Sequence, residues 1–495
     1  MSKVSNEMEK MKDENQLDAF QEKEDNDAIS MLTDEQKEFV LSRTKKSVLL
    51  SSCAGSGKTH CCVLRLKQLM KRGVDPKKII FFSFTNAAVE ELKERVNNPD
   101  IRVTTIHSFC FWMLHRMGKF KGVTNFYEFI EWYKITNKPS KKSTQKEVFK
   151  FDKIISNLYD DADFLDSQIS SYKLQTADGI KVRIPDFYIP YSKYLREKRK
   201  RDFSDILLDV RNLLKENKWL KMFKDKYDYL FLDEYQDTST IQMDILMKLN
   251  AKKYYLVGDL NQSIYGYSGS NCAAIEDILL KRRKVDRMSL TTNFRSAKQI
   301  ISNSNQFSSL DAKSFHTFDG EINETFIDFD KLVELIKNKD EVVVLARTNF
   351  IVKLIEFNLL SRKVPLNYFN YLKEKDVEDI KDGKINSLIR KRLDYVLDNF
   401  PGGVMDLVRF IEENKENKNF VTTIHKSKGK EFHTCVVVNS LPEDLVEKNE
   451  IEIPSDKKDY YTFYPGMDGY QEEKNVHYVA VSRPKRKLYY MLLQI

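Results

Sequence analysis

The stretch that decides the fold is Ser52-Cys53-Ala54-Gly55-Ser56-Gly57-Lys58-Thr59, which follows the apolar run 47–51 and precedes a helical pattern. Its two glycines allow backbone N–H groups to turn towards one phosphate, and the following helix directs its positive end at the same spot. Lys58 is placed for the β- and γ-phosphates and the Thr59 hydroxyl for Mg²⁺. The stretch therefore predicts a Walker A loop that binds ATP, with Ser52 where this motif usually has glycine.

A second stretch, Asp233-Glu234-Tyr235-Gln236-Asp237, comes directly after the apolar run 229–232. The end of a buried strand is where α/β folds collect their functional groups. We expect Asp233 to hold Mg²⁺, directly or through water, and Glu234 to orient and deprotonate the attacking water. A solvated acidic turn is the alternative, and the apolar strand before it disfavours that interpretation.

Apolar runs alternate with helical patterns along the chain, which favours an α/β fold with parallel strands. Thr33 is a cap-like residue that opens the first clear helical pattern. Residues 111–200 are rich in Lys, Tyr and Phe, and they predict an inserted, mostly helical unit. The expected strands form a first series at 47–51, 79–83, 229–232 and 254–257, and a second series, implying a second α/β domain, at 325–327, 342–345, 422–424 and 435–438.

Charge is unevenly distributed along the 495 residues, whose formal net charge is +8. Residues 1–30 hold nine acids and four lysines and predict a disordered acidic tail, which leaves +13 on the remainder. That excess suits a polyanionic partner, although an ordinary charged surface explains it equally well. The six cysteines lack C-x-x-C spacing, which disfavours a zinc or iron–sulfur site. No signal peptide and no membrane span are expected, and the default is a cytoplasmic protein.

Further motifs follow in an order that resembles the superfamily 1A helicases of the UvrD/Rep/PcrA type, over residues 31 to 492. The order of the matches makes the resemblance specific. They are Gln36 (Q-motif), 84–88 FTNAA (motif Ia), 105–108 TIHS (Ib), 202–205 DFSD, 258–265 GDLNQSIY (III), 290–296 LTTNFRS (IV), Arg347 and Asn349 (IVa), 423–432 TIHKSKGKEF (V) and 478–483 YVAVSR (VI).

This resemblance implies a nucleotide site to which both α/β domains contribute. Hydrolysis develops charge on the γ-phosphate oxygens, so cations must converge there. Lys58 would come from the first domain, and Arg295 and Arg483 from the second, so that closure depends on ATP. The family pattern also assigns adenine reading to Gln36, adenine stacking to Phe294, ribose binding to Glu431 and γ-phosphate sensing to Gln262.

The resemblance also implies single-stranded DNA and single-strand/duplex junctions as partners. Single-strand binding needs stacking platforms and phosphate donors. Tyr267 falls where the family has a base-stacking Trp, and the glycines that flank it favour a loop over core packing. The other candidate DNA contacts are Thr85, Asn86 and His107 in the first domain, and Tyr265, Asn349 and His425.

The sequence departs from the family pattern in two ways. Ser268, Lys430 and Pro484 replace the usual Arg, Leu and Ala, without removing a catalytic group. In addition, only 128 residues separate Arg295 from Thr423, which is too short for a large 2B domain. We therefore expect a compact form of the family with a reduced or absent 2B domain. No nuclease signature follows motif VI, and a fused nuclease is not expected.

The expected fold class is α/β, with two RecA-like P-loop domains and a mainly helical inserted 1B domain. The expected function is ATP-dependent translocation and unwinding of DNA, with 3′→5′ polarity inferred from the family. The alternatives are a motor subunit that serves a protein partner, such as a nuclease in phage defence, and a nucleotide-controlled DNA-binding protein. Repair, replication and defence would all use such a motor. The expected domains are a tail at 1–30, 1A at 31–110 and 202–285, 1B at 111–201, 2A at 286–375 and 416–495, and a 2B remnant at 376–415.

Overall fold

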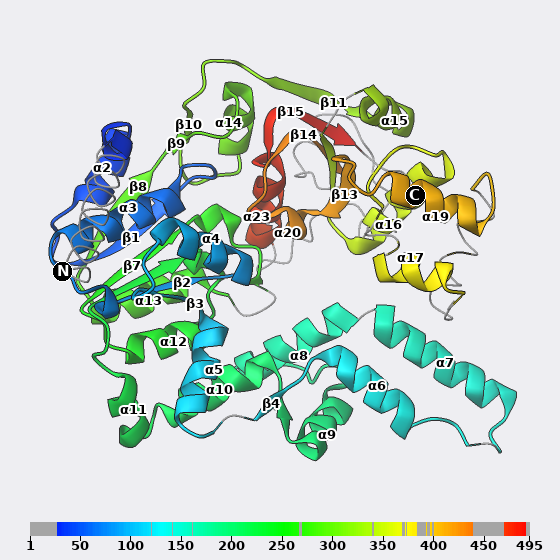
Figure 1. Cartoon of the computed structure of the whole chain (residues 1–495), viewed down its shortest axis with the longest axis horizontal. Coiled ribbons are helices and arrows are strands. Elements are labelled where there is room, and N and C mark those ends of the chain that lie inside the picture. Colours follow the sequence, from blue (N-terminus) through cyan, green and yellow to red (C-terminus); the bar gives the residue numbers. More distant parts are fainter. Residues whose placement is uncertain are drawn as a thin grey trace, which may run out of the picture. The chain divides into compact units, whose positions relative to one another are not determined.

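The computed structural model describes residues 27–119, 121–140, 142–160, 162–266, 270–338, 341–368, 372, 374–383, 393, 397, 400–438 and 470–491. Of the tail expected at 1–30, residues 1–26 therefore lie outside the described residues. The chain, shown in Figure 1, divides into two compact units. The first comprises Met1–Phe120, Ile206–Asp259 and Cys272–Thr292, and the second comprises Lys121–Asp205, Leu260–Asn271 and Asn293–Ile495.

The first unit is built on a six-stranded parallel sheet with the order β3-β2-β6-β7-β1-β8. The four runs predicted for this sheet are confirmed as strands, and every residue of β2 is buried, as in parallel sheets that are covered on both faces. β8 pairs with β1 in parallel, and the first unit that contains both strands extends to Thr292. The strands are β1 (Ser47–Ser52), β2 (Ile79–Ser83), β3 (Arg102–Thr105), β6 (Tyr229–Asp233), β7 (Lys253–Gly258) and β8 (Val285–Leu290).

Helix α2 shows how local sequence sets the element boundaries. Thr33 Oγ1 accepts a hydrogen bond from Gln36 N (3.3 Å), and Gln36 Oε1 accepts one from Thr33 N (3.1 Å), which forms a capping box. The predicted helix start at Thr33 is thus confirmed. The helices of this unit are α2 (Asp34–Leu41), α3 (Lys58–Lys71), α4 (Asn86–Val96), α5 (Ile106–Arg116), α10 (Phe203–Leu213, which continues from the second unit), α11 (Asn217–Phe223), α12 (Thr240–Lys248) and α13 (Cys272–Arg282), with 3₁₀ turns η1 (Pro76–Lys78) and η2 (Tyr235–Asp237).

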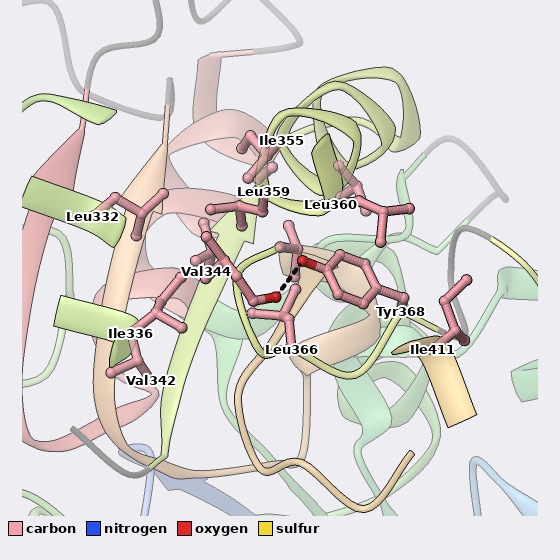
Figure 2. Packing of buried hydrophobic residues seen from close by; sticks show 14 of the residues in the cluster. Leu332, Ile336, Val342, Val344, Ile355, Leu359, Leu360, Leu366, Tyr368 and Ile411 are labelled. Atoms are coloured by element: carbon pink, nitrogen blue, oxygen red, sulfur yellow. Dashed lines mark hydrogen bonds between the residues drawn. The ribbon is translucent and has the colours of Figure 1, made fainter. Parts of the chain in front are cut away.

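The second unit contains a five-stranded parallel sheet with the order β11-β15-β14-β12-β13. Figure 2 shows Val344 of β12 among Ile336, Leu359 and Tyr368, and the Tyr368 hydroxyl donates to the Val364 carbonyl at 2.6 Å. The second predicted series is confirmed, except that β13 ends one residue early, where the next helix begins. The strands are β11 (Glu321–Ile327), β12 (Val342–Ala346), β13 (Phe420–Thr423), β14 (Phe432–Val438) and β15 (Pro484–Met491).

Helices around this sheet include the described part of the segment expected to be a 2B remnant. Val377 and Ile380 of α17 and Leu407 and Ile411 of α19 are buried in the same cluster as Val344. These two helices therefore complete the core of the second sheet. The elements are η3 (Leu260–Gln262), β9 (Thr292–Asn293), α14 (Lys298–Asn305), β10 (Lys313–Ser314), α15 (Phe329–Asn338), α16 (Asn349–Ser361), α17 (Glu374–Lys381), α19 (Val404–Glu413), α20 (Ile424–Ser427) and α23 (Tyr470–Val481).

The insertion after α5 is mainly helical and has an aromatic core that includes Phe126, Phe129 and Tyr191. The buried Lys173 ammonium lies 2.6 Å from Asp202 and 2.8 Å from Asp205, so an ion-paired cluster joins α8 to the DFSD element. Within the ranges given above, no helix is both long enough and apolar enough to cross a membrane. The elements are β4 (Gly122–Val123), α6 (Phe126–Thr136), α7 (Gln145–Asp160), α8 (Ala162–Ala177), α9 (Tyr188–Lys198) and β5 (Lys200–Arg201).

Candidate nucleotide and nucleic-acid sites

The loop between β1 and α3 has the backbone that the Walker A pattern requires. Gly55 and Gly57 have φ values of +66° and +74°, a left-handed conformation that favours glycine. The Ser56 hydroxyl is buried and has no hydrogen-bond partner within the described structure. Ser52, where glycine is usual, donates from its hydroxyl to the Gly258 carbonyl at 3.0 Å and so ties β1 to β7. The loop therefore has the conformation of a phosphate cradle with an unsatisfied polar group.

The two predicted carboxylates at the end of β6 meet the two functional side chains at the start of α3. Lys58 Nζ lies 2.8 Å from Glu234 Oε1, and Thr59 Oγ1 donates to Asp233 Oδ2 at 2.9 Å. Burial, together with the charge of Glu234, raises the pKa of Asp233 to about 6. Although burial opposes it, the charges of Glu234 and Asp233 raise the pKa of Lys58, so its ammonium stays protonated.

Glu234 is held in a strained position by a residue that the sequence prediction did not assign. Its φ and ψ are 54° and 45°, a conformation that costs a non-glycine residue about 1–3 kcal/mol. Gln236 Nε2 donates to Glu234 Oε2 at 2.6 Å, and Gln236 Oε1 accepts from Asp259 N at 3.1 Å. A Cβ on Gly258 would lie 2.2 Å from Gln236 Oε1, so glycine is required there. In the sequence, the signal that could have identified Gln236 was its position within the acidic stretch 233–237.

The oxygen atoms at this site fit a magnesium ion. Thr59 and Asp233 present a hydroxyl and a carboxylate within one hydrogen bond of each other. No cluster of three or more His, Cys, Asp or Glu side chains able to hold a metal occurs in the part of the chain that the structure describes. Mg²⁺ suits such a sparse set, because it commonly uses one or two carboxylates together with substrate phosphates and water.

Gln36, the predicted adenine reader, lies against the phosphate loop. Its Nε2 donates to the Ser56 carbonyl at 3.0 Å. The neighbouring Glu35 accepts hydrogen bonds from the backbone and hydroxyl of Thr291, at 2.8 and 2.6 Å. The buried Arg65 of α3 donates to the Val40 carbonyl at 3.0 Å. Helix α2 is therefore fixed from both ends, with its glutamine beside the loop.

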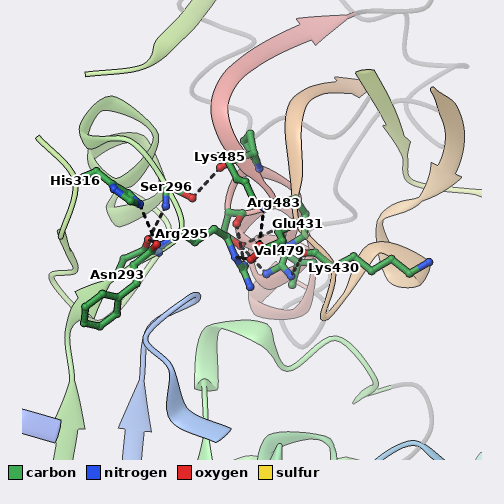
Figure 3. Close-up of polar contacts among 12 residues, drawn as sticks. Asn293, Arg295, Ser296, His316, Lys430, Glu431, Val479, Arg483 and Lys485 are labelled. Carbon is green, nitrogen blue, oxygen red and sulfur yellow. Dashed lines mark hydrogen bonds and ion pairs between the residues drawn. The ribbon is translucent and has the colours of Figure 1, made fainter. Parts of the chain in front are cut away.

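In the second unit, a polar network surrounds both predicted arginines (Figure 3). Arg295 Nε donates to Glu431 Oε2 at 2.8 Å, and Lys485 Nζ lies 2.7 Å from the other oxygen. Arg483 is buried and donates to the carbonyl groups of Val479 (2.9 Å) and Lys430 (3.0 Å). The structure thus joins Glu431, expected at the ribose, directly to Arg295, a pairing that the sequence did not predict.

Phe294, the predicted adenine-stacking residue, belongs to an aromatic pair. Its ring centroid lies 4.9 Å from that of Phe315, with the planes 37° apart. Phe315 is 62% exposed, so the pair presents an aromatic surface to solvent. Sequence reasoning did not identify Phe315, because it belongs to none of the family motifs.

The residues of motif III contact motifs V and VI. The ring centroids of Tyr265 and His425 are 6.1 Å apart, and Arg483 Nη2 donates to Gln262 Oε1 at 3.3 Å. Lys428 Nζ donates to the Gln262 carbonyl at 2.5 Å. Burial lowers the pKa of His425 to about 4, so its imidazole is neutral at pH 7. The structure thus brings Gln262, Tyr265, His425 and Arg483 together, whereas Tyr267 and Ser268 lie outside the described residues.

The remaining candidate DNA contacts lie at the carboxyl edges of the two sheets. Thr85 caps α4 by accepting from Ala88 N at 3.2 Å, and Asn86 begins that helix. His107 lies in the first turn of α5, after the neighbouring strand, and burial lowers its pKa to about 4. In the second unit, Asn349 begins α16, and it lines one groove together with His425.

Two family models match the chain. The model of the UvrD/REP helicase N-terminal domain matches residues 32–284, and that of the UvrD-like helicase C-terminal domain matches residues 404–494. The first match alone covers more than half of the chain and contains the P-loop and Glu234. The chain belongs to the UvrD/REP helicase family. This membership confirms the resemblance inferred from the order of the motifs.

Similar proteins occur in Staphylococcus and Mycoplasma species. The chain is 28% identical over 397 residues to the ATP-dependent DNA helicase PcrA of Staphylococcus epidermidis, which covers 72% of this chain and 53% of that protein. It is 26% identical over 392 residues to the probable DNA helicase II homolog of Mycoplasma capricolum, which covers 72% and 54%. The chain thus spans about half the length of the curated relatives that it matches.

Proposed function

We propose that this chain is an ATP-dependent DNA translocase and helicase that hydrolyses ATP on the P-loop of its first unit. The observation that carries the proposal is the contact of Lys58 and Thr59 with Glu234 and Asp233 at the carboxyl edge of a parallel sheet. The names of the similar proteins, which are DNA helicases, support DNA as the substrate.

Each residue of the first unit has a distinct part in this proposal. The loop backbone and Lys58 bind the β- and γ-phosphates. Glu234 accepts a proton from the attacking water, and Gln236 keeps its carboxylate oriented by the 2.6 Å hydrogen bond. Thr59 and Asp233 would hold Mg²⁺, which neutralises phosphate charge when it is bound.

The second unit is proposed to link phosphate chemistry to DNA. Arg295 and Arg483 are assigned to the γ-phosphate and Gln262 to sensing it. The hydrogen bond between Gln262 and Arg483 and the contact between Tyr265 and His425 support a continuous connection from motif VI to the candidate DNA contacts. We assign 3′→5′ polarity from family membership, and a compact form without a large 2B domain from the core position of α17 and α19.

An observation at Glu234 favours a motor over a nucleotide-controlled binding protein. A protein that only binds ATP has no need to hold a water-activating carboxylate in a strained conformation by a dedicated glutamine. A motor subunit serving a nuclease would use the same site, and the second arm of the test below separates it from a helicase that works alone.

The test has two arms, both with the full chain. ATP hydrolysis is measured with and without single-stranded DNA, and strand separation is measured on duplexes with a 3′ or a 5′ tail. We expect hydrolysis to be stimulated by the strand and unwinding to need the 3′ tail. Stimulated hydrolysis without unwinding would point to the motor subunit, and hydrolysis that ignores DNA would contradict the proposal.

A further inference from the structure

Three cationic side chains converge on one tryptophan in the first unit. The guanidinium carbon of Arg102 lies 3.7 Å from the centroid of the Trp112 ring, and that of Arg116 lies 5.8 Å from it. Lys226 Nζ lies 5.6 Å from the same ring. Arg102 begins β3 and Lys226 precedes β6, so these residues lie at the amino edge of the parallel sheet, opposite the edge that carries the P-loop. We call the four residues the tryptophan cluster.

The three cations of this cluster act on one another. Burial and the charges of Arg116 and Arg102 lower the pKa of Lys226. Burial and the charge of Arg116 also lower the pKa of Arg102, although a hydrogen bond with Tyr227 opposes that shift. In the described part of the chain, none of the three cations forms an ion pair with a carboxylate. An anion bound at the cluster would therefore offset repulsion between like charges.

Helix α11 and the residues beside it extend this positive surface. Residues 215–226 hold five lysines and only two acids, and one of these acids, Asp225, accepts a hydrogen bond from Asn250 Nδ2 at 2.6 Å. The ring of Phe223, the last residue of α11, lies 5.5 Å from that of Trp112 on α5, so the two helices meet at the cluster (Figure 1). The lysines of this stretch that we call the α11 lysines are all exposed, and they are Lys218, Lys221 and Lys224.

The aromatic rings of this surface are already engaged by neighbouring side chains. Trp112 stacks on Phe109 with the ring centroids 5.4 Å apart, in addition to its contact with Arg102. On α11, Lys218 Nζ lies 4.6 Å from the ring of Trp219. Binding of unpaired bases needs aromatic platforms on which they can stack. The surface offers cations in place of such platforms, which suits a duplex, because a duplex keeps its bases paired and carries one negative charge per about 1.7 Å of its axis.

We propose that the tryptophan cluster and the α11 lysines form a second DNA-binding surface, which takes the phosphate backbone of duplex DNA. The choice of DNA as the polyanion rests on the proposed function. The surface itself is separate from the ATP site and from the candidate single-strand contacts, which lie at the carboxyl edges of the sheets. Phosphate contacts of this kind position a protein on a duplex and carry no sequence information.

The test uses the full chain and a covalently closed circular duplex, which has no single-stranded end. Binding is measured by filter retention over a series of salt concentrations. Arg116→Gln/Lys226→Gln should weaken binding and reduce the slope of log K against log salt by about 1.8, because each phosphate contact contributes about 0.9. Lys337→Gln/Lys375→Gln is the matched control, since it removes two exposed charges from helices α15 and α17 of the second unit, and it should leave the slope unchanged.

Basal ATP hydrolysis and the urea-unfolding midpoint should be the same in both variants and in wild type, because the cluster lies at the edge of the sheet away from the P-loop. A wild-type slope in the Arg116/Lys226 variant would overturn the assignment to duplex DNA and leave an acidic protein as the partner of this surface. Equal reductions in the variant and its control would overturn it too, because they would report net charge alone.

A packing role for the cations has its own signature, which is a lower unfolding midpoint in the Arg116/Lys226 variant with unchanged duplex binding, and that result also contradicts the inference. Failure of the proposed function looks different, because the ATP hydrolysis of wild type would then not respond to single-stranded DNA, whatever its binding to the circular duplex.

Discussion

The ammonium group of Lys58 lies 2.8 Å from the carboxylate of Glu234, so one ion pair joins the phosphate loop to the end of β6. The partners are 176 residues apart in the sequence. They meet because β1 and β6 are parallel strands of one sheet, and parallel strands deliver the residues that follow them to the same edge. The first two of the four predictions below test this site, and the other two test buried ionisable side chains elsewhere in the chain.

Glu234→Gln should retain ATP binding and lose about 10²–10⁴-fold in turnover, because an amide cannot accept the proton from water. The amide keeps the shape of the carboxylate, so the loop should stay folded. Turnover is measured by phosphate release, and binding by a fluorescent ATP analogue. Loss of nucleotide binding at normal thermal stability would instead assign Glu234 to positioning Lys58.

Gly258→Ala should displace Gln236, since the new methyl group would lie 2.2 Å from Gln236 Oε1. Such overpacking destabilises the fold by about 1–3 kcal/mol. The displacement of Gln236 would also break its hydrogen bond to Glu234. Turnover should therefore fall together with the urea-unfolding midpoint. Gly122→Ala is the matched control, because a Cβ there would meet only Lys200 Cγ at 3.7 Å, an ordinary van der Waals contact. Normal turnover in the Gly258 variant would show that Gln236 does not orient Glu234.

Lys173→Met should destabilise the chain by about 3–5 kcal/mol, because it leaves the carboxylates of Asp202 and Asp205 close together without their cation. Burial and the Asp202 charge already raise the pKa of Asp205. Lys281→Met is the control, since its ion pair with Asp277 is exposed and should contribute only about 0–1 kcal/mol. Equal urea-unfolding curves for the two variants would show that the buried cluster does not stabilise the fold.

His107→Gln should reduce the pH dependence of stability. Burial lowers the folded-state pKa of His107 from 6.5 to about 4, so the unfolded chain binds more protons between these values. The free energy of unfolding must then rise with pH across this window. The stability that depends on a neutral, buried His107 is lost as the pH falls towards 4. Unfolding midpoints measured across the window should show a shallower slope for the variant. An unchanged slope would mean that His107 is protonated equally in both states.

The sequence predicted the parts of the fold that depend on continuous apolar runs. β1, β2, β6 and β7 are such runs, and the motif residues that follow them reach one edge of a parallel sheet by topology alone. β8 was not predicted as a strand, because its residues form no continuous apolar run; it lies at the edge of the sheet, and only Leu290 of its six residues is buried. Strand β13 was predicted to include Ile424, but Thr423 accepts a hydrogen bond from Lys426 N and starts a helix there.

Side-chain partners from distant segments could not be predicted in the same way. Gln236 is identified by its contacts with Glu234 and Asp259, which depend on the absence of a side chain at Gly258. Glu431 was assigned to ribose, and its pairing with Arg295 depends on the register between β14 and β15. The 2B remnant at 376–415 was inferred from a length count, and such a count does not show that α17 and α19 bury side chains in the core of the second sheet.

The most direct test of the central claim is the ATP hydrolysis rate of wild type and Lys58→Ala, each with and without single-stranded DNA. The claim predicts that wild type hydrolyses ATP faster in the presence of the strand, and that Lys58→Ala loses hydrolysis in both conditions while its thermal unfolding profile is retained. Turnover of Lys58→Ala within about tenfold of wild type would contradict the assignment, because the proposal gives the β/γ-phosphate contact to this ammonium group.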